Sequence, residues 1–170
     1  MDIRETTENA RRSVWKTGIA GAPLPVPAER VFNFPEGLPA FEFTRRFMFL
    51  SAADTQPFFF MHALETQDLS FVCVCPFLVC PGYTLNLAEA DRRFLDLERS
   101  EDALVASIVT VEPDPHDITT NLKGPVVVNV RKRIGKQIIA NGTDYPVRYR
   151  LWEVLGGLEE DAVRRGNGTP

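Results

Sequence analysis

The stretch Pro125–Ala140, PVVVNVRKRIGKQIIA, places two apolar, β-branched runs on either side of a short basic segment. β-Branched residues favour strands, and Gly135 lies between the runs, where its freedom to take a positive φ would suit a turn. The pattern therefore predicts a β-hairpin at the centre of a sheet. Because side chains alternate along a strand, Val126 and Val128 are expected on one face and Asn129 on the other.

A second apolar run, Leu104–Val111, precedes the hairpin and is expected to pair with it in an antiparallel sheet. Other short runs lie between proline- and glycine-containing turns. They predict strands at Val14–Ala20, Val31–Phe34, Arg46–Leu50, Phe58–Leu64, Leu69–Cys75 and Tyr145–Leu151. One stretch, Ala88–Leu97, has the periodicity of a helix. Many short strands with one helix predict a closed or nearly closed β structure.

The length and composition indicate one globular domain. The chain has 170 residues, of which 44% are hydrophobic and 25% charged, as in ordinary globular proteins. We expect a disordered extension over residues 1–13, a β domain over 14–155 and a flexible tail over 156–170. No apolar run approaches the roughly 20 residues of a membrane helix, and the N-terminus lacks a signal-peptide core. The expected location is the cytoplasm.

The charge pattern favours protein partners over nucleic acid. The formal net charge is −4, which suits solubility and basic partners. The basic cluster inside the hairpin, Arg131–Arg133 with Lys136, is expected to be a solvated tip that discourages edge pairing. An RNA-binding β-barrel that uses this cluster is the alternative function, although such proteins usually add exposed aromatics and an overall basic charge.

The cysteines offer a possible metal site. Cys73 and Cys75 share a face of one predicted strand, Cys80 follows, and His62 could complete a zinc set. Cysteine pairs in zinc sites are usually spaced further apart, and free cysteine is among the most buried residue types, so core packing is the favoured role and no cofactor is expected. Pro76, directly after this strand, indicates that the next segment lies at a sheet edge.

No motif for catalysis is present. The segment Glu112–Asp117 combines three acids with a histidine, but its prolines and aspartates are typical of a surface loop. The sequence lacks a Gly-x-Ser-x-Gly nucleophile motif, a phosphate-binding glycine-rich loop and a His-Glu-x-x-His zinc motif. We therefore expect a protein that is not an enzyme.

An ordered series of segments between Val31 and Ala140 resembles the FliW family of flagellar assembly factors. The segments are Phe34–Glu42, Pro57–Phe59, Asp68–Phe71, Pro76–Phe77, Ile108–Val111, Thr120–Asn129 and Lys136–Gln137. The chain departs from the family at Ala40, where glycine is usual, and at Gly124, where alanine is usual.

The resemblance implies a mainly β, single-domain, small pseudo-β-barrel of antiparallel strands with about one short helix. It also implies two protein partners, flagellin and CsrA, a small dimeric RNA-binding repressor of translation. In the family, flagellin that accumulates occupies FliW and leaves CsrA free to repress flagellin synthesis. Export of flagellin then releases FliW, which antagonises CsrA. The free protein is expected to be a monomer that binds neither nucleic acid nor membrane.

The family motifs do not mark the partner-binding residues, because most motif positions resemble barrel core and turns. The candidates are acidic or exposed apolar loop positions. They are Glu42, Glu65, Gln67, Asp68, Phe77, Leu78 and Tyr83. The acids would suit a basic RNA-binding partner, and an apolar strip or sheet edge would suit the terminal helix of flagellin.

Overall fold

The structure of the chain, a computed structural model, describes residues 27–66 and 69–156. The extension expected over 1–13 and the strand predicted at Val14–Ala20 lie outside these residues, as does the tail after Gly156. In the described part, no helix is long and apolar enough to cross a membrane.

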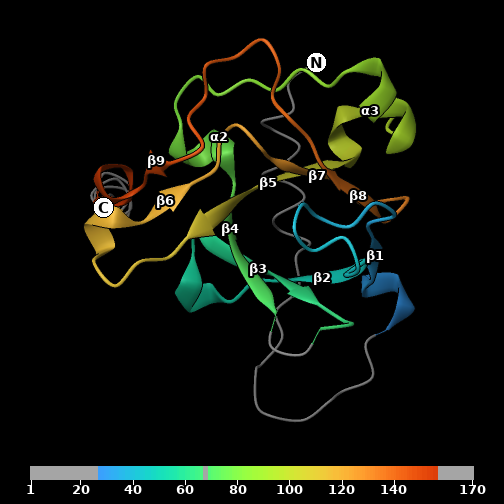
Figure 1. Ribbon diagram of the computed structural model, residues 1–170, viewed down its shortest axis with the longest axis horizontal. Helices are drawn as coiled ribbons and strands as arrows, with labels where there is room; N and C mark the ends of the chain where they lie inside the picture. The colour runs from blue at the N-terminus through green and yellow to red at the C-terminus, as the bar shows by residue number, and fades with distance from the viewer. Residues whose placement is uncertain (1–26, 67–68, 157–170) are drawn as a thin grey trace, which may run out of the picture.

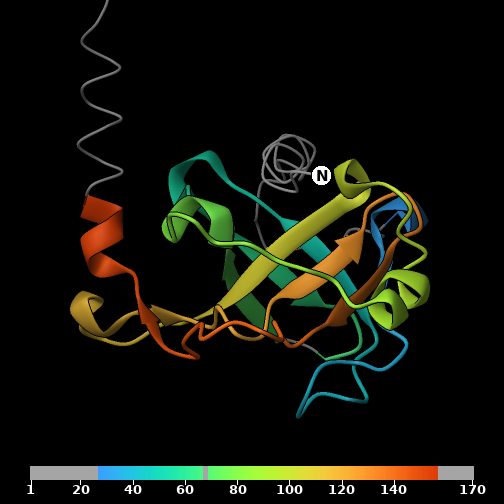
Figure 2. The same cartoon turned by 90° about the horizontal axis from the view of Figure 1, so that it is seen from above.

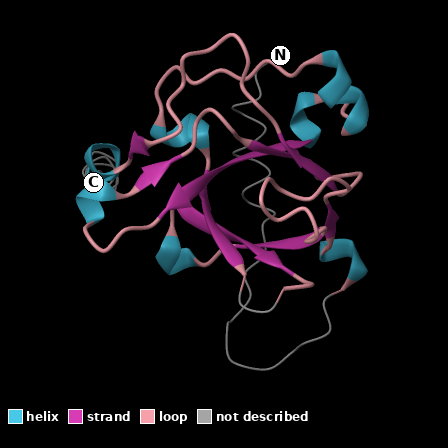
Figure 3. Ribbon diagram, in the orientation of Figure 1, coloured by secondary structure: helices cyan, strands magenta, loops and turns pink. Residues whose placement is uncertain are grey.

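Within the described residues, nine strands form one curved sheet (Figures 1 and 3). They are β1 (Phe32–Asn33), β2 (Arg46–Leu50), β3 (Phe58–Ala63), β4 (Ser70–Val74), β5 (Ala103–Thr110), β6 (Thr119–Thr120), β7 (Val126–Asn129), β8 (Ile134–Gln137) and β9 (Tyr149–Arg150). The short α-helices α2 (Pro76–Val79) and α3 (Glu89–Phe94) lie between β4 and β5, and residues 152–156 of the described part are also helical. The 3-10 turns are η1 (Ala28–Arg30), η2 (Ala53–Thr55), η3 (Ser100–Asp102) and η4 (Pro115–Asp117).

Seven strands close into a barrel in the order β4-β3-β2-β1-β8-β7-β5, because β4 also pairs with β5. The expected mainly β barrel is confirmed. One pairing differs from the all-antiparallel expectation, since β1 runs parallel to β8 through Asn33 and Ile134. These strands meet from distant parts of the chain rather than through a hairpin turn, so no local signal set their direction. Closure leaves no free edge around the barrel wall.

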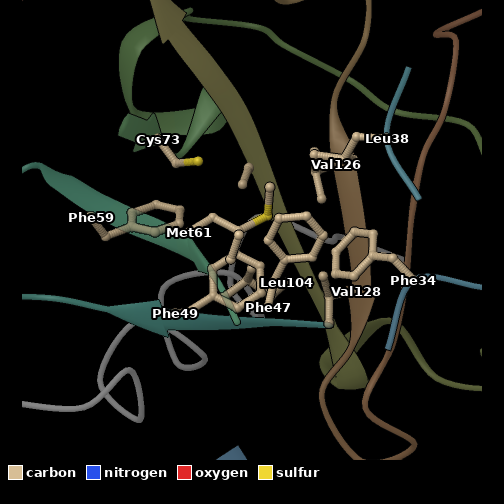
Figure 4. Close-up of a cluster of buried hydrophobic side chains, with 12 residues drawn as sticks. Phe34, Leu38, Phe47, Phe49, Phe59, Met61, Cys73, Leu104, Val126 and Val128 are labelled. Atoms are coloured by element: carbon tan, nitrogen blue, oxygen red, sulfur yellow. The ribbon is translucent and has the colours of Figure 1, made fainter. Parts of the chain in front are cut away.

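Alternation along the strands fills the barrel with aromatic and aliphatic side chains (Figure 4). Phe59 and Met61 on β3 point inward with Phe47 and Phe49 on β2, and all four are at most 4% exposed. Phe34 packs edge-on against Phe47, with ring centroids 4.9 Å apart. A second buried cluster lies outside the barrel, beneath α3, and includes the opposite face of β5 and β7.

The predicted hairpin is confirmed as β7 and β8, but Gly135 has a different role from the one expected. It lies inside β8 opposite Val128, and it is Arg133 in the turn that takes a positive φ, of 55°. A Cβ on Gly135 would lie 2.3 Å from Cζ of Phe34. Glycine is required here because the Phe34 ring lies directly against the backbone of β8, not because the turn needs it.

Asn129 ends β7 and is 2% exposed. Its amide Nδ2 donates to the carbonyls of Leu95 (3.0 Å) and Asp96 (2.7 Å), just past α3. Its Oδ1 accepts from the backbone N–H groups of Arg131 and Lys132, each at 3.0 Å. Asn129 therefore joins α3 and the β7–β8 turn to the barrel wall. The expected alternation holds, because Asn129 faces away from the barrel core that contains Val126 and Val128.

Three other elements differ from their predicted extent. The segment after the cysteine-rich strand is the helix α2 rather than a sheet edge, because Pro76 suits the first turn of a helix and Val79 is buried against β5. The helix predicted over Ala88–Leu97 is confirmed but shorter. The last strand covers only Tyr149–Arg150 of the predicted Tyr145–Leu151. The first and last residues of short helices and strands depend more on packing than on the local sequence pattern.

Ser107 on β5 is fully buried, and its hydroxyl has no hydrogen-bond partner among the described residues. We expect Ser107→Ala to raise the free energy of unfolding by about 1 kcal/mol, since an unpaired buried hydroxyl costs about that much or more. Urea denaturation would measure the change. Thr120→Val is the matched control and should lower stability, because the Thr120 hydroxyl donates to the Ile108 carbonyl at 3.0 Å. A Ser107→Ala protein less stable than the original would contradict the expectation.

Candidate protein-binding surface

Residues 35–45, called the 35–45 loop below, connect β1 to β2 and have a fixed shape. Leu38 is buried in the barrel core, and its backbone forms an isolated bridge with Phe41. Gly37 has a φ of +69°, and a Cβ there would lie 2.6 Å from the Cα of Glu42. Only glycine fits such a position, so the loop folds tightly on itself.

Ala40 stands at the tip of this loop with a φ of +68°, in the left-handed region. Its N–H donates to Oε1 of Glu42 at 3.0 Å. The backbone conformation explains why a related sequence would place glycine here, since the left-handed region costs other residues about 1 kcal/mol or more. Glu42, one of the predicted binding residues, thus helps to hold the loop.

Phe43 is 95% exposed and is the feature of this loop that sequence reasoning missed. Its neighbours are anchored, because Phe41 packs edge-on against Phe71 with ring centroids 5.1 Å apart and Thr44 is buried. Phe43 therefore presents an apolar ring to solvent from a loop of fixed shape, and it is a candidate contact for a protein partner. The available signal was the Phe41-x-Phe43 spacing in a turn-rich segment, but it also suits two core residues.

Glu65 contacts Arg46, the first residue of β2, which directly follows the 35–45 loop. Its carboxylate accepts from the backbone N–H of Arg46 at 3.0 Å and from Nε of Arg46 at 2.6 Å. Partial burial alone would raise the pKa of Glu65, but the hydrogen bonds and charge of Arg46 hold it below its usual range. Glu65 is therefore ionised at neutral pH and already partnered. Its neighbours Gln67 and Asp68 lie outside the described residues.

The remaining candidates lie elsewhere on the molecule. Phe77 and Leu78, on α2, are half-buried and pack into the clusters outside the barrel. Tyr83 was expected to be exposed, but it is fully buried. Its hydroxyl donates to the Leu122 carbonyl at 2.9 Å, and its ring stacks on Tyr145 at 4.4 Å. Among the described candidates, those on and after α2 therefore lie apart from Glu42 and Glu65, and Tyr83 is a core residue.

Comparison with known proteins decides the family. The model of the FliW protein family matches residues 20–151. This chain belongs to the FliW family. A curated relative in Caldicellulosiruptor saccharolyticus, the flagellar assembly factor FliW, is 35% identical over 145 residues, which are 85% of this chain and 94% of the relative. FliW of Clostridium botulinum (strain Okra) is 34% identical over 123 residues, 72% of this chain and 86% of that protein.

A solved structure supports the same conclusion for the fold. The crystal structure of the flagellar assembly factor FliW superposes with a TM-score of 0.71 at 32% identity, covering 76% of this chain and 90% of the other. The FliW barrel, with its few short helices, is therefore the fold of this chain.

In this FliW-family chain the basic hairpin is largely paired with acids. Nζ of Lys136 lies 3.3 Å from Oε2 of Glu36 and 3.2 Å from Oδ1 of Asp91. Nζ of Lys132 lies 2.5 Å from Oδ2 of Asp96, and Nη1 of Arg131 lies 3.7 Å from Oδ2 of Asp102. Desolvation would lower the pKa of Lys136, but its two carboxylate partners raise it overall. Three of the four cations predicted for the RNA-binding alternative, Arg131, Lys132 and Lys136, therefore have acidic partners.

Cys73 and Cys75 are buried and Cys80 is partly buried. Cys73 pairs with Phe59 and points into the barrel, whereas His62 lies one position further along β3 from inward-facing Met61 and so faces outward. Burial raises the pKa of the Cys73 thiol to about 12, which disfavours a free thiolate at neutral pH. Among the described residues, no group of three or more metal-binding side chains is close enough to hold an ion.

Proposed function

We propose that this chain is a non-catalytic, cytoplasmic regulator that binds flagellin and the translational repressor CsrA in turn. When flagellin accumulates, it occupies this chain and leaves CsrA free to repress flagellin translation. When flagellin is exported, the released chain binds CsrA and lifts the repression. Membership of a family whose curated members are named flagellar assembly factors supports this proposal.

The feature that supports it most directly is Phe43. Flagellin has an apolar helix face that is unsatisfied before polymerisation, and such a face needs an exposed apolar anchor on its partner. Phe43 is 95% exposed on a loop of fixed shape, so little conformational entropy is lost when it is buried. The 35–45 loop is therefore assigned to flagellin in this proposal.

Phe43→Ser is expected to weaken flagellin binding at least about tenfold, equivalent to about 1.4 kcal/mol, because it removes the apolar anchor. The fold should not change, since the ring is almost entirely in solvent. Isothermal titration with purified flagellin would measure the affinity. Ile139→Ser is the matched control, because Ile139 is also exposed, at 58%, but is not part of the 35–45 loop.

One result would contradict the assignment of the 35–45 loop to flagellin, and a different result would contradict the proposed function. Unchanged flagellin affinity in Phe43→Ser would remove the 35–45 loop from the binding surface. Failure of the unaltered chain to co-elute with either flagellin or CsrA on size exclusion would contradict the proposed function itself.

A further inference from the structure

A second surface lies on an arm that extends away from the barrel. The end of β5 continues past the barrel wall and pairs with β6, which pairs in turn with β9 (Figures 1 and 2). We call residues 109–120 and 147–153 the flap. In both views the flap lies on a different side of the molecule from the 35–45 loop. Strand β9 pairs only with β6, so its outer edge is unpaired in the described sheet.

The flap presents large apolar side chains to solvent. Val111 is 60% exposed and Trp152 is 45% exposed. Val111 follows the Thr110–Thr119 pair, and Trp152 follows Leu151, whose N–H donates to the carbonyl of Ile118 at 3.0 Å, so both side chains belong to the flap. Tryptophan is enriched among residues that dominate binding energy at protein interfaces.

Carboxylates surround these apolar side chains. Residues 111–120 and 147–153 contain Glu112, Asp114, Asp117 and Glu153 against two arginines. Arg148 lies 3.9 Å from Glu112 and Arg150 lies 3.7 Å from Asp117, so these charges offset each other, whereas Asp114 and Glu153 leave the flap with a net negative charge. The backbone N–H of His116 and then its imidazole hold the pKa of Asp114 below its usual range, so that carboxylate is ionised at neutral pH. The flap therefore combines exposed apolar side chains with a net negative charge.

The flap is also rigid enough to serve as a preformed surface. Leu151 is fully buried and Val109 is 7% exposed, and both pack with Val74 on β4 and Val79 on α2. The ring of Trp152 lies over His116, with centroids 4.4 Å apart. The connection between β5 and β6 is thereby tied to the helical residues that start at Trp152.

We infer that the flap is a docking surface for a basic protein partner, with Trp152 as its apolar anchor and the surrounding carboxylates as the complement to the partner's positive charge. The choice of a basic partner follows from charge complementarity, which speeds encounter and disfavours acidic competitors. This inference depends on the proposed function, in which one partner is a basic RNA-binding protein. It adds that the two partners have different anchor residues, Trp152 in the flap and Phe43 in the 35–45 loop, and the exchange in the proposed function then requires that one bound protein exclude the other.

The test compares three variants for binding to purified CsrA and to purified flagellin by isothermal titration. Trp152→Ser removes the apolar anchor and is expected to weaken CsrA binding at least about tenfold. Glu153→Lys reverses one exposed charge, and the CsrA affinity should fall and become less sensitive to salt. Glu29→Lys is the control, because it makes the same charge change on exposed η1, away from the flap, and should leave CsrA binding unchanged.

The outcomes separate this inference from the proposed function. Loss of CsrA binding with retained flagellin binding in Trp152→Ser and Glu153→Lys would support the flap. CsrA binding equal to that of the unaltered chain in both variants would overturn the flap and leave the proposed function intact. Loss of flagellin binding instead would also overturn it. If the unaltered chain binds flagellin but not CsrA, that result would contradict both the proposed regulatory function and the inference that the flap binds a basic partner. Glu153→Lys remains informative even if Trp152→Ser does not fold.

Discussion

Asn129→Asp is expected to destabilise the protein by about 4 kcal/mol at neutral pH, because it places an unpaired charge in a buried site. The substitution keeps the shape of the side chain and the acceptor that binds the N–H groups of Arg131 and Lys132. It replaces the amide Nδ2, which donates to the carbonyls of Leu95 and Asp96, with an acceptor oxygen. Two carbonyl oxygens would then face a carboxylate oxygen at close range, with no water to separate them.

The loss of stability should depend on pH in a defined direction. Burial and the facing carbonyls disfavour the charged form, so the folded-state pKa of the new carboxyl is raised above its unfolded value of about 3.9. Stability is therefore retained below about pH 4, where the protonated carboxyl can donate to one carbonyl. It is lost as the pH rises through the raised folded-state pKa.

Urea denaturation between pH 4 and pH 8 would measure this dependence against the unaltered chain. Asn86→Asp is the matched control, since Asn86 is exposed and the same change there should alter stability little at any pH. A difference between Asn129→Asp and the unaltered chain that stays constant over this range would show that the site is not desolvated. We expect the difference instead to grow with pH.

Gly135→Ala is expected to lower the free energy of unfolding by about 3 kcal/mol, the upper part of the range for overpacked cores. The new Cβ would lie 2.3 Å from Cζ of Phe34 and 2.7 Å from each adjacent ring atom. Phe34 has no room to retreat, because it is fully buried and packs edge-on against Phe47. Either β8 moves away from β1 or the Phe34 ring leaves its position in the barrel core.

A double substitution tests whether this specific contact is responsible. Phe34→Leu removes the ring, so Gly135→Ala should cost much less in that background than in the unaltered chain. Gly156→Ala is the control for the change of residue type, because a Cβ there meets no atom within 4 Å. Thermal or chemical denaturation would measure the four proteins of this cycle and the Gly156→Ala control. Equal costs of Gly135→Ala in the two backgrounds would contradict the assigned role of Phe34.

The strands were predictable because their signals are local. The strand Arg46–Leu50 has the predicted bounds, and β3, β4, β5 and β7 begin within one or two residues of their predicted starts. In each, β-branched or aromatic residues form a run bounded by turn residues, and alternation assigns each side chain to a face. The barrel itself was predicted from the family resemblance, because the alternating pattern alone is compatible with several closed β folds.

The binding surface was less predictable. Glu42 and Glu65 were identified from their charge, but the structure shows that both carboxylates already accept hydrogen bonds from nearby N–H groups. Tyr83 was placed among the exposed loop residues, yet its ring is stacked inside the second cluster. Phe43 was missed because it directly follows the Phe34–Glu42 segment and its spacing from Phe41 also suits two core residues. Exposure of a large apolar side chain depends on what packs around it, which the local sequence does not state.

The amino-acid sequence by itself determined the strands, their inward and outward faces, the short helix near residue 90 and the family. These depend on residues within a few positions of one another, and on the order of motifs along the chain. Only the tertiary structure decided the parallel β1–β8 pairing, the need for glycine at position 135, the four hydrogen bonds of Asn129 and the exposure of Phe43 and Trp152. Each of these depends on groups that are distant in sequence and meet only when the barrel closes.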